Sequence, residues 1–95
     1  MNSIYKPETV QKIDIVIGKR IARLRKQNNL SQKELALLCN TDASRIGKTE
    51  RGVYGLQIRT LVLLADILNT DIETVLPIKE LNALKKDIRR KSEDY

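Results

Sequence analysis

The side chains of this 95-residue chain that could take part in chemistry are mainly cations. Eighteen Lys and Arg residues stand against twelve Asp and Glu, which gives a formal net charge of +6. The excess is concentrated between Lys12 and Lys26, where six basic residues accompany a single acidic one, Asp14. A basic balance of this kind favours polyanionic partners, nucleic acid before an anionic membrane surface. The residue types therefore predict electrostatic binding.

Composition excludes several catalytic and metal-binding chemistries. The chain has no His and one Cys, Cys39, so it lacks the residues for a Ser-His-Asp or Cys-His nucleophile, for a zinc site of Cys and His, and for an intrachain disulfide. Gly47-Lys48-Thr49 ends like a phosphate-binding loop, but that motif requires a glycine where Asp42 stands. We expect no enzymatic activity, no metal site and no cofactor.

Neither a signal peptide nor a membrane span is predicted. The segment from Met1 to Asp14 has no apolar core, and no run of the chain approaches the roughly 18 apolar residues that a span needs. The lack of a disulfide framework fits a reducing compartment. We therefore expect a cytoplasmic protein without a membrane partner.

Apolar residues recur at helical spacing along most of the chain. A first stripe consists of Ile13, Ile17, Ile21 and Leu24. It predicts a helix that ends near Asn28. The stripe does not fix the residue at which the helix begins, because Gly18 weakens a continuous helix through this region. Further stripes predict a fourth helix over 61–68 and a short fifth over 72–76. We expect an all-α protein with an N-terminal extension (1–12), a helical domain (13–77) and a C-terminal amphipathic helix (78–95).

Two short capped helices are predicted between Ser31 and Gly52. Ser31 and Glu34 match a capping box at the start of the first helix, and Asn40 tolerates the left-handed conformation of a sharp turn. Asp42 can cap the second helix, which Gly52 ends. The side chains expected to face inward are Leu35, Ala36, Leu38, Cys39 and Ile46. Two short helices joined by a tight turn form the helix-turn-helix arrangement.

These segments resemble the lambda and Cro repressor helix-turn-helix family, from about Ile17 to Leu76. The matching residues are Leu30-Ser31-Gln32, Glu34-Leu35-Ala36, Ile46, Glu50-Arg51-Gly52 and the helix over 61–68. Within that family, the segment over 56–61 is similar to small controller proteins of restriction-modification systems. The resemblance implies a five-helix domain that binds double-stranded DNA, here with an additional C-terminal helix.

The chain departs from the family's pattern at three positions. Asn40 stands where Gly is usual, and Gln57, a poorer cap, stands where the fourth helix usually begins with Ser or Thr. Gly47 replaces a residue that is usually polar, and a glycine inside a helix costs about 1 kcal/mol relative to Ala. We interpret Gly47 either as a position of close approach to DNA or as simple tolerance.

The second helix of the motif predicts the DNA-reading residues. With Ile46 inward and about 100° per residue, Ser44, Lys48 and Arg51 lie on the opposite face, and Arg45 flanks them. Because the N-terminal part of such a helix enters the major groove, we expect base contacts from Ala43, Ser44, Arg45 and Lys48, with Ala43 against a thymine methyl. Backbone or mixed contacts are expected from Gln32, Thr41, Arg51, Tyr54 and Arg59. The resemblance also implies a structural ion pair between Arg25 and Glu50.

The C-terminal segment carries a narrow apolar stripe, Ile78, Leu81, Leu84 and Ile88. This stripe either folds back on its own domain or pairs with a second subunit, and we favour the homodimer because the first five helices supply the core of the motif. The sequence thus predicts a dimeric, sequence-specific transcriptional regulator that acts as a repressor or autoregulator. The alternative is an antitoxin-like module that sequesters a protein partner and binds DNA secondarily.

Overall fold

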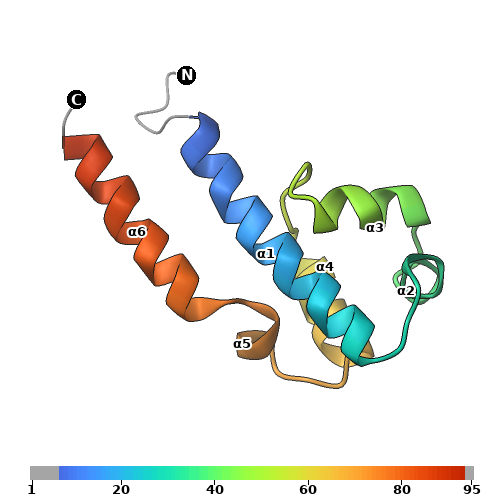
Figure 1. Cartoon of the computed structure of the whole chain (residues 1–95). Helices are drawn as coiled ribbons and strands as arrows, with labels where there is room; N and C mark the ends of the chain where they lie inside the picture. Colours follow the sequence, from blue (N-terminus) through green and yellow to red (C-terminus); the bar gives the residue numbers. More distant parts are fainter. Residues whose placement is uncertain (1–6, 94–95) are drawn as a thin grey trace.

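The computed structural model describes residues 7–93, which form six helices and no strand (Figure 1). In chain order the helices are α1 (Pro7–Gln27), α2 (Gln32–Leu38), α3 (Ala43–Glu50), α4 (Ile58–Ile67), α5 (Ile72–Val75) and α6 (Ile78–Glu93). The predicted all-α class, with one helix beyond the first five, is confirmed. Among the described residues, no helix has both the length and the apolar character that crossing a bilayer requires.

The first helix starts earlier than its apolar stripe predicts. Residues 7–12, expected to belong to an extension, are continuous with the rest of α1, while residues 1–6 lie outside the described residues. Pro7 suits the first turn because its missing N–H would have no intrahelical partner there. Gly18 does not interrupt the helix, and its role is in packing: a Cβ at this position would overlap the main-chain oxygens of Thr49 and Glu50. Glycine therefore lets α1 cross the end of α3 at close range.

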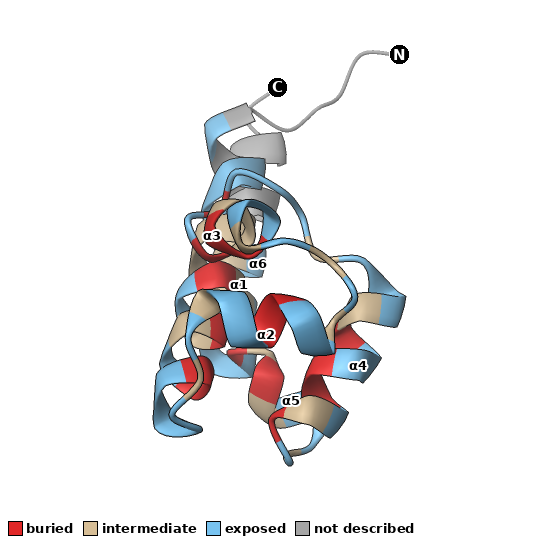
Figure 2. Cartoon of the chain, turned by 90° about the vertical axis from the view of Figure 1, so that its right-hand side faces the viewer, coloured by how far each residue is buried: buried red, intermediate tan, exposed pale blue. Residues whose placement is uncertain are grey.

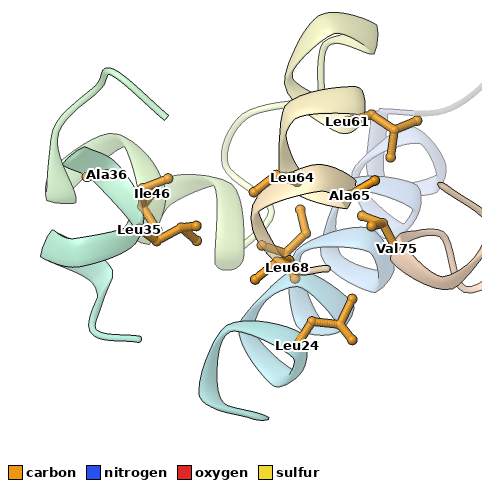
Figure 3. Close-up of a cluster of buried hydrophobic side chains, with 10 residues drawn as sticks. Leu24, Leu35, Ala36, Ile46, Leu61, Leu64, Ala65, Leu68 and Val75 are labelled. Carbon is orange, nitrogen blue, oxygen red and sulfur yellow. The ribbon is translucent and has the colours of Figure 1, made fainter. Parts of the chain in front are cut away.

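The core lies where α1 to α5 converge. Ile21, Leu35, Leu64 and Val75 are the largest fully buried side chains. Figure 3 shows Leu64 of α4, Leu68 directly after it and Val75 of α5 gathered beside Leu24 of α1. The seven-residue α2 turns one face inward, and Figure 2 shows its outer face exposed.

Leu35 and Ala36 occupy the inner face of α2. The expectation that Leu38 also faces the core is wrong, because 57% of Leu38 is exposed. At about 100° per residue, Leu35, Ala36 and Cys39 share one face of the helix, and Leu38 lies roughly 110° away from its centre. Cys39 is half-buried and packs at the edge of the core.

Four helices end in the same way, with one residue in the left-handed region. These residues are Asn29 (φ 57°), Asn40 (φ 56°), Gly52 (φ 78°) and Asn69 (φ 52°). In each case the next N–H donates to a carbonyl five residues back, in the pairs Leu30–Arg25, Thr41–Ala36, Val53–Lys48 and Thr70–Ala65. This is the Schellman pattern, which stops a helix and reverses the chain. The left-handed turns expected at Asn40 and Gly52 are confirmed.

The last helix packs along the first in the opposite direction, so that the start of α1 and the end of α6 lie at one end of the molecule (Figure 1). Leu81 and Leu84 are half-buried, and 44% of Ile78 is exposed; the side chain of Ile88 lies outside the described residues. Nearby, the Arg20 guanidinium donates to the Thr74 carbonyl (3.2 Å) and ties α1 to α5. Part of the apolar stripe of α6 therefore covers its own domain, as the fold-back interpretation expects.

Candidate nucleic-acid interface

The two helices of the motif are fixed by hydrogen bonds at their N-termini. In α2, the Ser31 hydroxyl accepts from the Glu34 N–H (3.0 Å) and the Glu34 carboxylate accepts from the Ser31 N–H (2.9 Å), so the predicted capping box is confirmed. In α3, the Asp42 carboxylate accepts from the Arg45 N–H (2.9 Å). Ile46 is buried and anchors α3 to the core. The position and rotation of α3 are therefore set by local chemistry and by packing together.

The outward face of α3 carries the residues predicted to contact bases. Ser44 and Arg45 are exposed, Lys48 is half-buried, and together with Asp42 and Tyr54 they line one shallow hollow. Ala43 is half-buried at the first turn and does not line this hollow. The structure thus brings together three of the four predicted base-contact residues on a single surface.

Tyr54 lies against the cations of this surface. The Arg45 Cζ is 5.0 Å from the centroid of the Tyr54 ring, and the Lys48 Nζ is 5.7 Å from it. Both distances fall within the roughly 6 Å over which a ring face attracts a cation. Tyr54, predicted as a contact to the DNA backbone, is therefore also a neighbour of the predicted base-reading side chains.

A buried carboxylate joins the three helices around the motif. Glu50 of α3 accepts two bonds from Arg25 of α1, from Nε (2.6 Å) and Nη2 (3.1 Å), and one from the Gln32 amide of α2 (3.0 Å). Arg25 also donates to the Leu30 carbonyl (2.9 Å). Both charged groups are buried, and the hydrogen bonds that Arg25 donates to the Glu50 carboxylate raise the pKa of Arg25. Gln32, expected at a phosphate, thus has one amide hydrogen committed to the interior.

Gly47 lies beneath two side chains, a contact that helical spacing alone did not suggest. It is buried, and a Cβ there would lie 3.6 Å from the amide atoms of Gln32 and 3.1 Å from Nη1 of Arg51. Both side chains pass over α3 at this position, and only the flexible end of Arg51 would have to shift to admit a methyl group. Because Gln32 and Gly47 belong to different helices, their contact leaves no periodic signal in the sequence.

The remaining predicted backbone contacts surround α3 at different depths. Arg51 and Arg59 are exposed, at the end of α3 and in the first turn of α4. Thr41 is half-buried and lines a cleft between the α2–α3 turn and the start of α4, opposite Gln57 and Thr60. Gln57 makes no side-chain cap bond, in agreement with its description as a poorer cap.

The described residues also carry exposed apolar side chains, but no cluster of metal ligands. Sequence reasoning missed an exposed apolar group on α4 and α5, which consists of Ile58, Val62, Leu63 and Ile72. Val62 and Leu63 fall between the core positions of α4, and Ile58 and Ile72 are the first residues of α4 and α5, so only their apolar character could have signalled them. Within the part of the chain that the structure describes, no group of three or more His, Cys, Asp or Glu side chains could hold a metal ion.

The chain is similar to proteins named as helix-turn-helix regulators and to one named as a control protein. A relative from Rickettsia conorii, an uncharacterised HTH-type transcriptional regulator, is 34% identical over 68 residues, which are 72% of this chain and 54% of the relative. Control protein C.SmaI of Serratia marcescens is 33% identical over 61 residues, 64% of this chain and 73% of that protein. The chain spans about half the length of the curated Rickettsia relatives that it matches.

A solved structure and a family model agree with these relatives. The restriction-modification controller protein C.AhdI from Aeromonas hydrophila aligns with a TM-score of 0.66 and 29% identity, over 70% of this chain and 96% of that one. The helix-turn-helix family model matches residues 21–75, which include α2 to α5 and the last third of α1. The resemblance seen in the sequence is confirmed, and the chain belongs to the helix-turn-helix family.

Proposed function

We propose that this protein is a sequence-specific regulator of transcription that places α3 in the major groove of double-stranded DNA. The observation that carries the proposal is the outward face of α3, where Ser44, Arg45 and Lys48 meet on a helix that the Glu50 hydrogen bonds hold in place. A recognition helix must present base-reading side chains on a rigid support, since each good bidentate contact adds about 1–3 kcal/mol of discrimination.

Different residues of this surface serve affinity and specificity. Arg45 and Lys48 can donate to the O6 and N7 acceptors of guanine, and Ser44 can bond to a base edge at the start of the helix. Arg51, at the end of α3, and Arg59, in the first turn of α4, are exposed and suit phosphate oxygens, with Thr41 and Gln32 as further polar candidates. Phosphate contacts of this kind position the helix and make its affinity depend on salt.

The relatives support regulation over sequestration of a partner. Their names describe transcriptional regulators and control proteins, so the antitoxin-like alternative is not favoured. We propose a cytoplasmic repressor or autoregulator that binds across a promoter as a homodimer, through the apolar stripe of α6, on two half-sites about one helical turn apart.

The proposal is tested by selecting binding sites from a pool of randomised duplexes with the full chain. We expect one consensus with two-fold symmetry, bound about a thousandfold more tightly than a scrambled duplex at physiological salt. Its log affinity should fall steeply against log salt. Occurrence of the consensus upstream of the protein's own gene would support autoregulation.

Two variants locate the interface. The Lys48→Ala/Arg51→Ala protein should lose the preference for the consensus, whereas Lys85→Ala should keep it, because Lys85 is an exposed cation on α6, across α1 from α3 (Figure 1). A pool that yields no consensus would overturn the regulator proposal. If both variants lost the preference for the consensus equally, the effect would come from the net charge of the protein and not from the α3 surface.

A further inference from the structure

The position of Tyr54 is determined by the end of α3. The chain reverses at Gly52, and the Val53 N–H donates to the Lys48 carbonyl (2.9 Å). This bond holds the next residue, Tyr54, close to the last turns of α3. With 38% of its surface exposed, the tyrosine lies at the rim of the hollow and is not part of the core.

Two cations of α3 share the ring of Tyr54. Arg45 and Lys48 are three residues apart and so lie on one face of the helix, and their charged groups lie 5.0 Å and 5.7 Å from the ring centroid. The negative potential of the ring face attracts both. Asp42 lines the same hollow, but its carboxylate already accepts from the Arg45 N–H as the cap of α3.

We propose that Tyr54 is a positioning residue, whose ring holds the Arg45 and Lys48 side chains toward the groove before DNA arrives. This inference rests on the proposed function. Long flexible side chains lose rotamer freedom when a ligand orders them, and that loss reduces affinity. A ring that orders two such side chains in the free protein removes part of the loss from the binding step. The role belongs to the ring, whereas the predicted backbone contact would belong to the hydroxyl.

Tyr54→Phe and Tyr54→Leu separate the ring from the hydroxyl. In the free protein, NMR should show ring-current shifts of the Arg45 Hδ and Lys48 Hε protons in the wild type and in Tyr54→Phe, and their loss in Tyr54→Leu. Affinity for the selected duplex should fall about two- to fivefold in Tyr54→Leu, the effect of a cation–π attraction at an exposed site. Tyr54→Phe keeps the ring and should weaken binding less than Tyr54→Leu, and any loss that it shows measures the predicted contact between the hydroxyl and the DNA backbone. Thermal unfolding of the three proteins controls for altered stability.

The outcomes distinguish this role from the proposed function. Equal weakening by both substitutions would assign the effect to the hydroxyl and overturn the positioning role. Unshifted Arg45 and Lys48 protons in the wild type, or full affinity in Tyr54→Leu, would overturn it as well, while sequence selection by α3 would stand. A wild-type protein that selects no sequence would overturn the proposed function itself, and the free-protein shifts would still report whether the ring holds the cations.

Discussion

Two glycines inside helices face different kinds of atom, main chain in one case and side chain in the other. At Gly18 a Cβ would meet main-chain oxygens of α3, which cannot move without shifting the helix. At Gly47 a Cβ would meet the ends of two side chains, of which Arg51 is exposed and flexible. The residue type and helical setting are the same, yet the cost of a methyl group depends on what it touches.

Alanine substitutions should therefore act in opposite directions at these two positions. Gly18→Ala should lower the free energy of unfolding by about 1–3 kcal/mol, the usual cost of overpacking, despite the better helix propensity of alanine. Gly47→Ala should raise it by about 0.5–1 kcal/mol, because the propensity gain is retained when Arg51 moves aside. Urea unfolding of both variants measures this, and a stabilised Gly18→Ala would refute the close approach of α1 and α3.

The buried Glu50 depends on its partners for solvation. Removing Arg25 would leave the carboxylate with a single bond from Gln32, which does not balance its charge. Arg25→Ala should cost about 3–5 kcal/mol of stability, as breaking one side of a buried pair usually does. Its neighbour Lys26 is exposed on the same helix, and Lys26→Ala should change stability by no more than about 0.5 kcal/mol. Equal thermal midpoints for Arg25→Ala and the wild type would show that the pair is dispensable.

At the scale of the elements, local signals were predictable and contacts between elements were not. The capping box of α2, the Asp42 cap and the turns at Asn40 and Gly52 could be predicted, because each depends on residues within one turn of the chain. The exposure of Leu38 depends on which face of α2 meets the core. The packing role of Gly18 depends on where α1 crosses α3. Those facts belong to the assembled fold and are absent from any single stripe.

In the candidate site, too, relations within one helix were predictable and contacts between elements were not. Spacing around Ile46 predicted that Ser44 and Lys48 share an outward face, since a helix fixes that relation. It could not predict that Tyr54 returns to Arg45, because the path of a loop depends on the turn before it. Nor could it predict that Gln32 crosses Gly47.

The capping box of α2 makes stability depend on acid pH in a defined direction. The hydrogen bonds from the Ser31 N–H and hydroxyl lower the pKa of Glu34 from its ordinary value of 4.5. A lowered folded-state pKa means that the contribution is fully present above the unfolded value and is lost as pH falls through the folded one. Glu34→Gln keeps the acceptor but removes the titration. Its stability should thus lie below that of the wild type at neutral pH and converge with it as pH falls through the lowered folded-state pKa, and parallel urea-stability curves would exclude a role of the charge.

For the whole molecule, the proposed homodimer requires an apolar surface that joins two copies. The helix-turn-helix family model ends at Val75, so α6 lies beyond the matched region, and part of its stripe already packs on α1. Ile78, at the first turn, remains 44% exposed, and Val62 on α4 is exposed to a similar extent, at 50%. The two residues therefore form a matched pair for locating an interface.

We expect sedimentation equilibrium of the wild type to give a dimer at micromolar concentration. Ile78→Asp should weaken it about tenfold or more, because a carboxylate buried between two apolar helices loses its hydration. The aspartate lies at the N-terminus of α6, where a negative charge favours the helix, so the monomer should stay folded. Val62→Asp should leave the dimer intact if α6 forms the interface. Dissociation by Val62→Asp alone would move the interface to α4, and a wild type that stays monomeric at high micromolar concentration would overturn the homodimer and, with it, the two-fold symmetry expected in the selected DNA site.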